Sequence, residues 1–433
     1  MKPLVAALAL LALAGCAGAG SLPSAPHAAT LTQVTHGRAA SDAATGTPGE
    51  YSAGLPGEYS AGLPGEYSAG LPGEYSAGLP GEYSAGLPGE TSAGLPGASF
   101  ACSGLPAEGT AACTLAINFN VPPIPGAAQP AAMIPGLHPA DLQSAYALPS
   151  QSPGGTVAIV DAYDNPAAEA DLAVYRAAFN LPACTTANGC FRKVNQRGQS
   201  GSYPAANTAW AQESALDLDM VSAGCPRCSI VLVEADSALI DDLGASVDTA
   251  VRLGATAVSN SYYAIEWSNQ GAEDVHYRHD GVAITASSGD RGYASYPAAS
   301  QRVTSVGGTA LSRGAGGWSE TGWKYAGHGC SKYTAKPWYQ NRLGCKTRDT
   351  VDVAAVADPQ TGVSTFSTAG GGWYVAGGTS VGAPLIAAAY ALSGHPADPG
   401  YSYLRWRSGF RQIDGGGYRP LTGIGSPVGL SGL

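Results

Sequence analysis

Ser380 stands in the stretch GGTSVGAP, residues 377–384, directly before the helix-like run LIAAAYAL. A serine at the start of a helix and after paired glycines suits a nucleophile, because nearby backbone N–H groups can face a developing oxyanion. The same position also suits plain capping of the helix N-terminus. A catalytic interpretation therefore requires a base that takes the proton of Ser380.

No histidine stands where a subtilisin-like order of Asp, His and Ser would place it. Asp161 ends the apolar run VAIVD, but the next histidine is His276. The region where the histidine should open a helix reads AWAQESALDLDM, residues 209–220, and offers Glu213 and Asp217. Carboxylates at i and i+4 share one helix face and can share a proton, although such pairs are also common on solvated faces. A carboxylate base restricts the chemistry to acid pH.

Five motifs give the sequence a specific resemblance to the sedolisin family of serine-carboxyl peptidases. They are WAQESALD followed by a strand, SSGDRG at 287–292, VTSVGGTAL at 303–311, DVAAVADPQTG at 352–362, and GGTSVGAP. The similarity runs in the family's order from about Gly136 to the C-terminus. It implies a subtilisin-like α/β fold, with a mainly parallel central sheet and helices on both faces, in a single catalytic domain. It also implies protein or peptide substrates.

The resemblance assigns a role to each of four residues. Ser380 matches the nucleophile, Glu213 the glutamate that takes its proton, and Asp217 the aspartate hydrogen-bonded to that glutamate. Asp290, in SSGD, matches the aspartate of the oxyanion hole. The chemistry agrees, because a neutral Asp290 carboxyl group can donate a hydrogen bond to an oxyanion, whereas an ionised one would repel it. Asp161, without a histidine partner, is interpreted as capping or orienting the end of its strand.

The pattern of apolar residues supports the same fold class. Short apolar runs alternate with amphipathic stretches, which is typical of a parallel sheet covered by helices. The predicted strands are 156–163, 229–235, 255–262 and 282–289, and the predicted helices are 169–179, 214–224 and 238–254. In such folds the chemistry takes place at the carboxyl ends of the strands.

The resemblance also implies a C-terminal calcium site, but its two acidic positions differ here. Gln412 precedes Ile413, and Tyr418 with Arg419 replaces a Trp-Asp pair. A hard cation needs oxygen ligands with negative charge, and an arginine brings the opposite charge. We therefore expect no calcium and no other cofactor, with Asp414 as the nearby acidic candidate for a rearranged site.

The N-terminus predicts export. Lys2 precedes the apolar run LVAALALLALAG, which is the length of a signal peptide and too short for a permanent transmembrane helix. Leu13 to Cys16, LAGC, resembles the bacterial lipobox, in which the cysteine receives the lipid; ordinary secretory cleavage nearby is the alternative. We expect a lipoprotein signal peptide over 1–15 and a lipid on Cys16. This anchor would hold the protein at a membrane, facing the periplasm or the cell exterior.

A repeated octamer separates this anchor from the catalytic domain. From Gly49 to Pro96 the unit GEYSAGLP recurs six times, with the last copy reading GETSAGLP, and one leucine per unit is too little to build a core. We predict a flexible tether over 16–100, a lead-in segment containing a disulfide over 101–136, and the peptidase domain over 137–433. No folded propeptide is predicted, so control by pH and maturation without such a domain both stay open.

Eight cysteines remain if Cys16 carries lipid, and an even number in an exported chain indicates disulfides. They lie as four pairs that are each local in sequence, so we predict that neighbours pair. The motif CPRC is interpreted as a small structural loop because no second CxxC accompanies it. The predicted disulfides are Cys102–Cys113, Cys184–Cys190, Cys225–Cys228 and Cys330–Cys345.

The composition and net charge restrict the classes of molecule that the protein is expected to bind. The formal net charge is −10 and only 12% of residues are charged, which disfavours nucleic-acid binding. We expect a monomer whose only membrane contact is the lipid. Two other functions compete with the peptidase: a catalytically inactive relative that serves as a surface-display or binding lipoprotein, and an esterase. The Glu213 and Asp217 pair disfavours the esterase, because the α/β-hydrolase order does not supply it.

Overall fold

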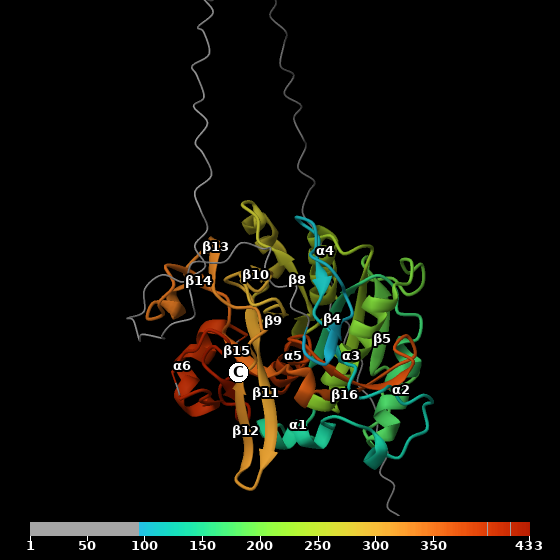
Figure 1. The fold of residues 1–433 in the computed structure, drawn as a ribbon. Coiled ribbons are helices and arrows are strands. Elements are labelled where there is room, and N and C mark those ends of the chain that lie inside the picture. The colour runs from blue at the N-terminus through green and yellow to red at the C-terminus, as the bar shows by residue number, and fades with distance from the viewer. Residues whose placement is uncertain (1–94, 396, 416) are drawn as a thin grey trace, which may run out of the picture. The chain divides into compact units, whose positions relative to one another are not determined.

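A largely parallel eight-stranded sheet organises the computed structural model, which describes residues 95–433 without 396 and 416. Seven strands follow the order β12-β11-β9-β7-β4-β6-β5, and β15 pairs with β11 (Figure 1). All neighbours are parallel except β11 and β12. The strands are β4 Thr156–Ala162, β5 Phe191–Asn195, β6 Ser229–Ala235, β7 Ala257–Asn260, β9 Ala283–Ser287, β11 Thr304–Gly314, β12 Gly317–Gly322 and β15 Val353–Val356.

Helices cover both faces of this sheet, as the sequence predicts for a subtilisin-like α/β domain. On β4, Val157 and Ile159 belong to one hydrophobic cluster and Ala158 and Val160 to a second. The first cluster contains residues of α2, α3 and α5, and the second contains residues of α4. The helices are α1 Pro139–Tyr146, α2 Ala168–Ala178, α3 Thr208–Gly224, α4 Ile240–Arg252, α5 Gly382–Ser393 and α6 Pro399–Gly409, with 3₁₀ turns η1 Ala131–Met133, η2 Gln270–Tyr277, η3 Trp338–Gln340 and η4 Pro359–Thr361.

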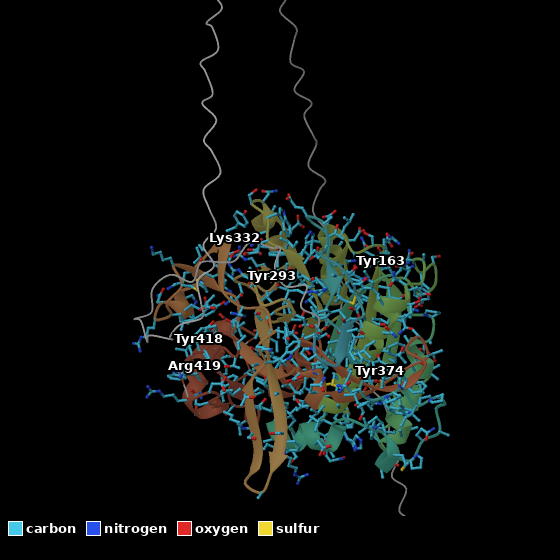
Figure 2. The ribbon with its side chains drawn as sticks, in the orientation of Figure 1. Tyr163, Tyr293, Lys332, Tyr374, Tyr418 and Arg419 are labelled. Atoms are coloured by element: carbon cyan, nitrogen blue, oxygen red, sulfur yellow. A yellow bond between two sulfur atoms is a disulfide. The ribbon has the colours of Figure 1, made fainter. Side chains whose placement is uncertain are left out.

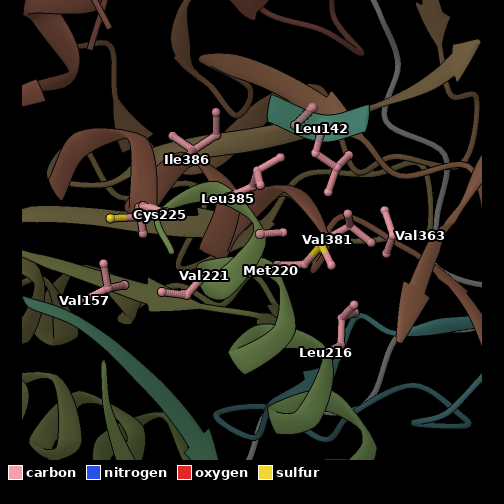
Figure 3. Close-up of a cluster of buried hydrophobic side chains, with 14 of the residues drawn as sticks. Leu142, Val157, Leu216, Met220, Val221, Cys225, Val363, Val381, Leu385 and Ile386 are labelled. Carbon is pink, nitrogen blue, oxygen red and sulfur yellow. The ribbon is translucent and has the colours of Figure 1, made fainter. Parts of the chain in front are cut away.

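The first cluster holds α3 against α5, which lie side by side near the centre of the domain (Figure 1). Figure 3 shows Leu216 and Met220 of α3 near Val381 and Leu385, at and beyond the start of α5. All four side chains are buried. Because these two helices carry or follow the predicted catalytic side chains, their apolar contacts fix the relative positions of those side chains.

Residues before the predicted domain boundary at 137 form part of the same unit. The smaller sheets have the orders β1-β3-β17-β16 and β10-β8-β2, with two further hairpins. The first of these strands, β1, covers residues 98–100, which are the last three residues of the predicted tether. These strands are β1 Ala98–Phe100, β2 Ala112–Cys113, β3 Ala116–Asn118, β8 Tyr262–Ile265, β10 Ser295–Tyr296, β13 Cys330–Ala335, β14 Thr347–Asp349, β16 Val363–Ser367, β17 Gly372–Gly377, β18 Phe410–Arg411 and β19 Ser426–Pro427.

Two predicted elements differ from the structure in extent. The strand predicted over 255–262 divides at Ser261, because β7 pairs within the central sheet while β8 pairs with β10 and β2. The helix predicted over 214–224 begins earlier, at Thr208. The Asn207 side chain accepts hydrogen bonds from the backbone N–H groups of Ala209 and Trp210, which is a standard N-cap.

The structure contains all four predicted disulfides, Cys102–Cys113, Cys184–Cys190, Cys225–Cys228 and Cys330–Cys345. Such a set is typical of an exported protein. The predicted signal peptide and Cys16 lie outside the described residues. Among the helices that the structure does describe, none has the length and apolar character needed to cross a membrane.

Candidate active site

Ser380 lies in the turn between β17 and α5 and is fully buried. It does not cap the helix: Val381 is the N-cap residue, and no side chain caps α5. The Ser380 hydroxyl donates instead to the backbone carbonyl oxygen of Thr114, 2.7 Å away. The capping interpretation of Ser380 is therefore wrong.

Glu213 and Asp217 lie one turn apart on α3, and both are fully buried. Neither carboxyl group has a partner with hydrogen-bonding geometry. Leaving buried carboxyl groups unpaired costs free energy, and it costs more when they are ionised. Such a pair is therefore not the solvated acidic face that the spacing alone also allowed.

Asp161, at the carboxyl end of β4, is a third buried carboxyl group beside this pair. Neither of its oxygens has a hydrogen-bond partner, so it does not cap the strand as the sequence suggested. Burial raises the pKa of Asp161 to about 8. Its charge in turn raises the pKa of Glu213 and of Asp217, which places the three carboxyl groups close together. Sequence reasoning missed this role, since it considered Asp161 only with a histidine partner.

Burial is the main reason why the pKa values of Glu213 and Asp217 lie well above their usual range, and the neighbouring acids add to it. The Ser380 hydroxyl and the Thr114 backbone act against this rise for Glu213, because they favour its ionised form. The Ser261 hydroxyl does the same for Asp217. Ser380 and Thr114 thus both adjoin the Glu213 carboxyl group, although the Ser380 hydroxyl points to Thr114 in this structure.

Asp290 approaches the same turn from the carboxyl end of β9. Its Oδ1 accepts hydrogen bonds from the Thr379 backbone N–H (2.9 Å) and the Thr379 hydroxyl (2.8 Å). Its buried Oδ2 has no partner. Burial raises the pKa of Asp290 to about 7, against the lowering effect of Thr379. Below that pH the neutral carboxyl group carries a proton, and the free oxygen can donate it.

The fold therefore brings together the four side chains singled out from the sequence. Glu213 adjoins Ser380 and Asp217, and the charge of Asp290 raises the pKa of Glu213 further. The structure adds Asp161 to this group. That the four residues are catalytic stays a prediction, which their convergence in one buried cluster supports.

The C-terminal loop does not fit a calcium ion at Gln412. The Gln412 amide nitrogen donates to the carbonyl oxygens of Trp406 (3.2 Å) and Ile424 (3.3 Å), and its oxygen accepts from the backbone N–H of Gly417 (2.9 Å). The amide nitrogen of Gln412 is a hydrogen-bond donor and offers no ligand to a cation on the side where it faces these two carbonyl oxygens. The amide itself ties this loop together.

The other residues named for this loop have the following surroundings. Asp414 Oδ2 accepts a hydrogen bond from the Gly322 backbone N–H (2.9 Å). The hydroxyl of Tyr418 donates to a backbone carbonyl, and Arg419 brings a positive charge. Figure 2 shows Tyr418 and Arg419 together in the C-terminal part of the chain, away from Tyr374, whose hydroxyl approaches the helix of Glu213. This donor set does not suit a hard cation.

The sheet order, the two helical layers and the turn that carries Ser380 define a subtilisin-like α/β fold. Among solved structures, the chain resembles a Pseudomonas sedolisin, a serine-carboxyl proteinase complexed with two molecules of pseudo-iodotyrostatin. The TM-score is 0.57 and the identity 22%, over 68% of this chain and 96% of that one. This likeness shows that the two proteins share the fold.

Other solved structures match less closely. An S41 psychrophilic protease has a TM-score of 0.47 and 16% identity, over 66% of this chain and 96% of its own. Sphericase has a TM-score of 0.44 and 18% identity, with the same coverage. No protein-family model and no curated protein matches the chain.

Proposed function

We propose that the protein is a serine-carboxyl peptidase that hydrolyses peptide bonds at acid pH. The observation that carries this proposal is the burial of a serine hydroxyl beside a cluster of unpaired carboxyl groups, on the fold of a known serine-carboxyl proteinase. The only hydrogen bond of the Ser380 hydroxyl goes to a backbone carbonyl. The histidines in the described residues make their hydrogen bonds elsewhere. A carboxyl group is then the available base.

In the proposed reaction, Ser380 Oγ attacks the peptide carbonyl carbon and gives its proton to Glu213. Glu213 returns that proton to the leaving amine, and an acyl-enzyme ester on Ser380 results. Asp217 and Asp161 adjoin Glu213, and the three carboxyl groups take up and release protons as one coupled set. The neutral Asp290 carboxyl group and the Ser380 backbone N–H donate hydrogen bonds to the oxyanion. Water then cleaves the ester by the reverse sequence of proton transfers.

The required protonation states predict a bell-shaped dependence of rate on pH. Glu213 must be ionised to act as a base, so its raised pKa moves the acidic limb upward from the ordinary value for glutamate. Asp290 must be neutral to donate, so activity falls as the pH rises through its pKa of about 7. Because the carboxyl groups interact, both limbs belong to the cluster as a whole. The optimum should lie on the acid side of neutrality.

The proposed location is outside the cytoplasmic membrane, with the lipid on Cys16 as anchor. The four disulfides support export. We propose protein or peptide substrates, no nucleic acid, a monomer, and no calcium or other cofactor. Mass spectrometry of the N-terminal peptide from the native host would test the lipid on Cys16.

The testing experiment is hydrolysis of casein between about pH 3 and pH 7, a window set by the pKa values of carboxyl groups. The full chain is compared with Ser380→Ala, Glu213→Gln and the matched control Ser312→Ala, at an exposed serine. We expect hydrolysis on the acid side only, lost in the first two variants and kept in the control. Activity that survives Glu213→Gln would contradict the carboxylate base. Absence of hydrolysis at every pH would favour the inactive display lipoprotein.

A further inference from the structure

Two tyrosines and one arginine lie beside the turn that carries Asp290, and the proposed reaction uses none of them. Tyr263 lies on β8, and Arg291 and Tyr293 come just after Asp290 in the chain. The rings of Tyr263 and Tyr293 meet edge to face, with their centroids 6.4 Å apart. These three residues, Tyr263, Arg291 and Tyr293, are called the Arg291 cluster.

Both tyrosine hydroxyls of this cluster lack a partner. The hydroxyl oxygens of Tyr263 and Tyr293 are buried, and neither has a hydrogen-bond partner in the part of the chain that the structure describes. Burial raises the pKa of Tyr263, and Arg291 and Tyr293 act against this rise, so both lie close to the Tyr263 hydroxyl. A buried hydroxyl without a partner costs free energy. Two of them side by side indicate a place for an acceptor that comes from outside the chain.

Arg291 brings the charge that would suit such an acceptor. Its guanidinium group forms no ion pair with a carboxylate of the described residues, whereas Arg348 and Arg411 each bind one. The Phe100 ring lies against the guanidinium group, with its centroid 4.0 Å from Arg291 Cζ. Stacking on a face leaves the N–H groups free, because they point outward in the plane of the guanidinium group. One guanidinium group and two hydroxyls form a donor set for a carboxylate.

Tyr263 lies beside the path that an extended peptide takes to Ser380. In the structure residues 112–114 follow this path, with Ala112 opposite Tyr263 and the Thr114 carbonyl oxygen 2.7 Å from Ser380 Oγ. Opposite residues of an antiparallel pair project to the same face, so a side chain in the place of Ala112 lies next to Tyr263. A substrate on this path must replace residues 112–114. Its third residue, counted back from the attacked carbonyl group, then takes the place of Ala112.

The present occupant of that place offers no acceptor to the cluster, because the side chain of Ala112 is a methyl group. The cluster also lies close to the proposed oxyanion residue. A Cβ atom on Gly289 would lie 3.7 Å from Cβ and Cγ of Tyr263, so this side chain packs on the residue before Asp290. Burial raises the pKa of Asp290 to about 7, and the charge of Arg291 acts against this rise. A substrate group bound here therefore lies near the reacting carbonyl group.

We propose that the Arg291 cluster is a substrate subsite that binds the carboxylate of a glutamate or aspartate side chain at the third residue before the cleaved bond. This inference rests on the proposed function. The guanidinium group of Arg291 donates hydrogen bonds to the carboxylate, and the hydroxyls of Tyr263 and Tyr293 donate to its remaining lone pairs. The protein then selects acidic segments of its substrates, and the selection depends on an ionised side chain.

The test uses synthetic peptides built on a site at which the full chain cuts casein. They differ only at the third residue before the bond, which is glutamate, glutamine or lysine. At about pH 5.5 the glutamate side chain is mostly ionised, since its ordinary pKa is about 4.3. We expect kcat/KM at this pH to be roughly tenfold higher, or more, for glutamate than for glutamine. This ratio should fall toward one as the pH drops below about 4.

Variants of the cluster connect this ratio to its residues. Arg291→Gln should bring the ratio close to one, and Arg291→Glu should reverse the preference in favour of the lysine peptide. Tyr263→Phe keeps the ring and should lower the ratio in part. It is the second test if an Arg291 variant does not fold, as judged by thermal unfolding. The matched control Arg313→Gln removes an exposed arginine outside the cluster and should keep the ratio.

The outcomes separate the subsite from the peptidase. Equal kcat/KM for the glutamate and glutamine peptides, or a ratio that Arg291→Gln and Tyr263→Phe leave unchanged, would overturn the subsite and leave the peptidase standing. A ratio that stays constant as the pH falls would also overturn the subsite, because an ionised side chain would then not be what is bound. Absence of hydrolysis of casein and of every peptide, at every pH, would overturn the peptidase and the subsite together.

Discussion

Replacing Asp161 by asparagine should weaken the pH dependence of the free energy of unfolding, because the substitution removes one titrating group. Asp161 is fully buried, and its pKa is raised by burial from 3.8 to about 8. Between these two values the folded protein holds a proton that the unfolded chain has lost. Stability from this group is therefore fully present below about pH 4 and is lost as the pH rises toward 8.

The magnitude follows from linkage. One extra proton in the folded state changes the free energy of unfolding by about 1.4 kcal/mol per pH unit, or roughly 4 kcal/mol between pH 4 and pH 7. Asparagine has nearly the same shape and stays neutral, so Asp161→Asn should be similar to the parent at pH 4 and more stable at pH 7.

The assay is urea unfolding at pH 4, 5, 6 and 7 in a Ser380→Ala background, where self-digestion is absent. Free energies from linear extrapolation are plotted against pH. Asp280→Asn, at an exposed carboxylate, is the matched control and should run parallel to the parent. If Asp161→Asn also runs parallel to the parent, Asp161 titrates normally and the description of the buried cluster is wrong.

Three further outcomes are expected. Asp290→Ala should lower kcat for casein by roughly 10²–10³-fold. Asp290→Asn should keep more activity and extend it above pH 7, because its amide donates a hydrogen bond at every pH. If Asp290 only shapes the turn, steady-state kinetics across pH would show equal losses in both variants. Chelation with EDTA should leave the thermal midpoint unchanged, because the amide of Gln412 holds the C-terminal loop, and a lower midpoint would indicate a bound cation. Arg348→Met should destabilise the fold by about 3–5 kcal/mol. The substitution leaves the buried Asp352 carboxylate without the guanidinium group that now binds it at 2.5 and 2.8 Å. A change in the free energy of unfolding of less than about 1 kcal/mol, measured with denaturant, would refute this.

The placement of Asp290 and Asp217 shows how much of the site the sequence could predict. Asp217 follows Glu213 by one helical turn, so local geometry alone places them on one face. Asp290 follows a buried strand, and the carboxyl ends of parallel strands gather at one edge of a sheet. The approach of Ser380 to Glu213 depends on the contact between α3 and α5, which the resemblance to sedolisins implied and which no local pattern could supply.

The sequence by itself determined the elements with strong local signals: the alternation of apolar strands and amphipathic helices, the acid pair on α3, the turn at Ser380 and the four neighbouring disulfides. These depend on side-chain period, capping and short loops, which act over a few residues. Only the tertiary structure decided that Asp161 joins the acid cluster, and that Thr114 reaches Ser380, 266 residues away along the chain. Such contacts are fixed by the packing of whole strands and helices, and the segment CTLAIN carries no local pattern that marks it as a neighbour of Ser380.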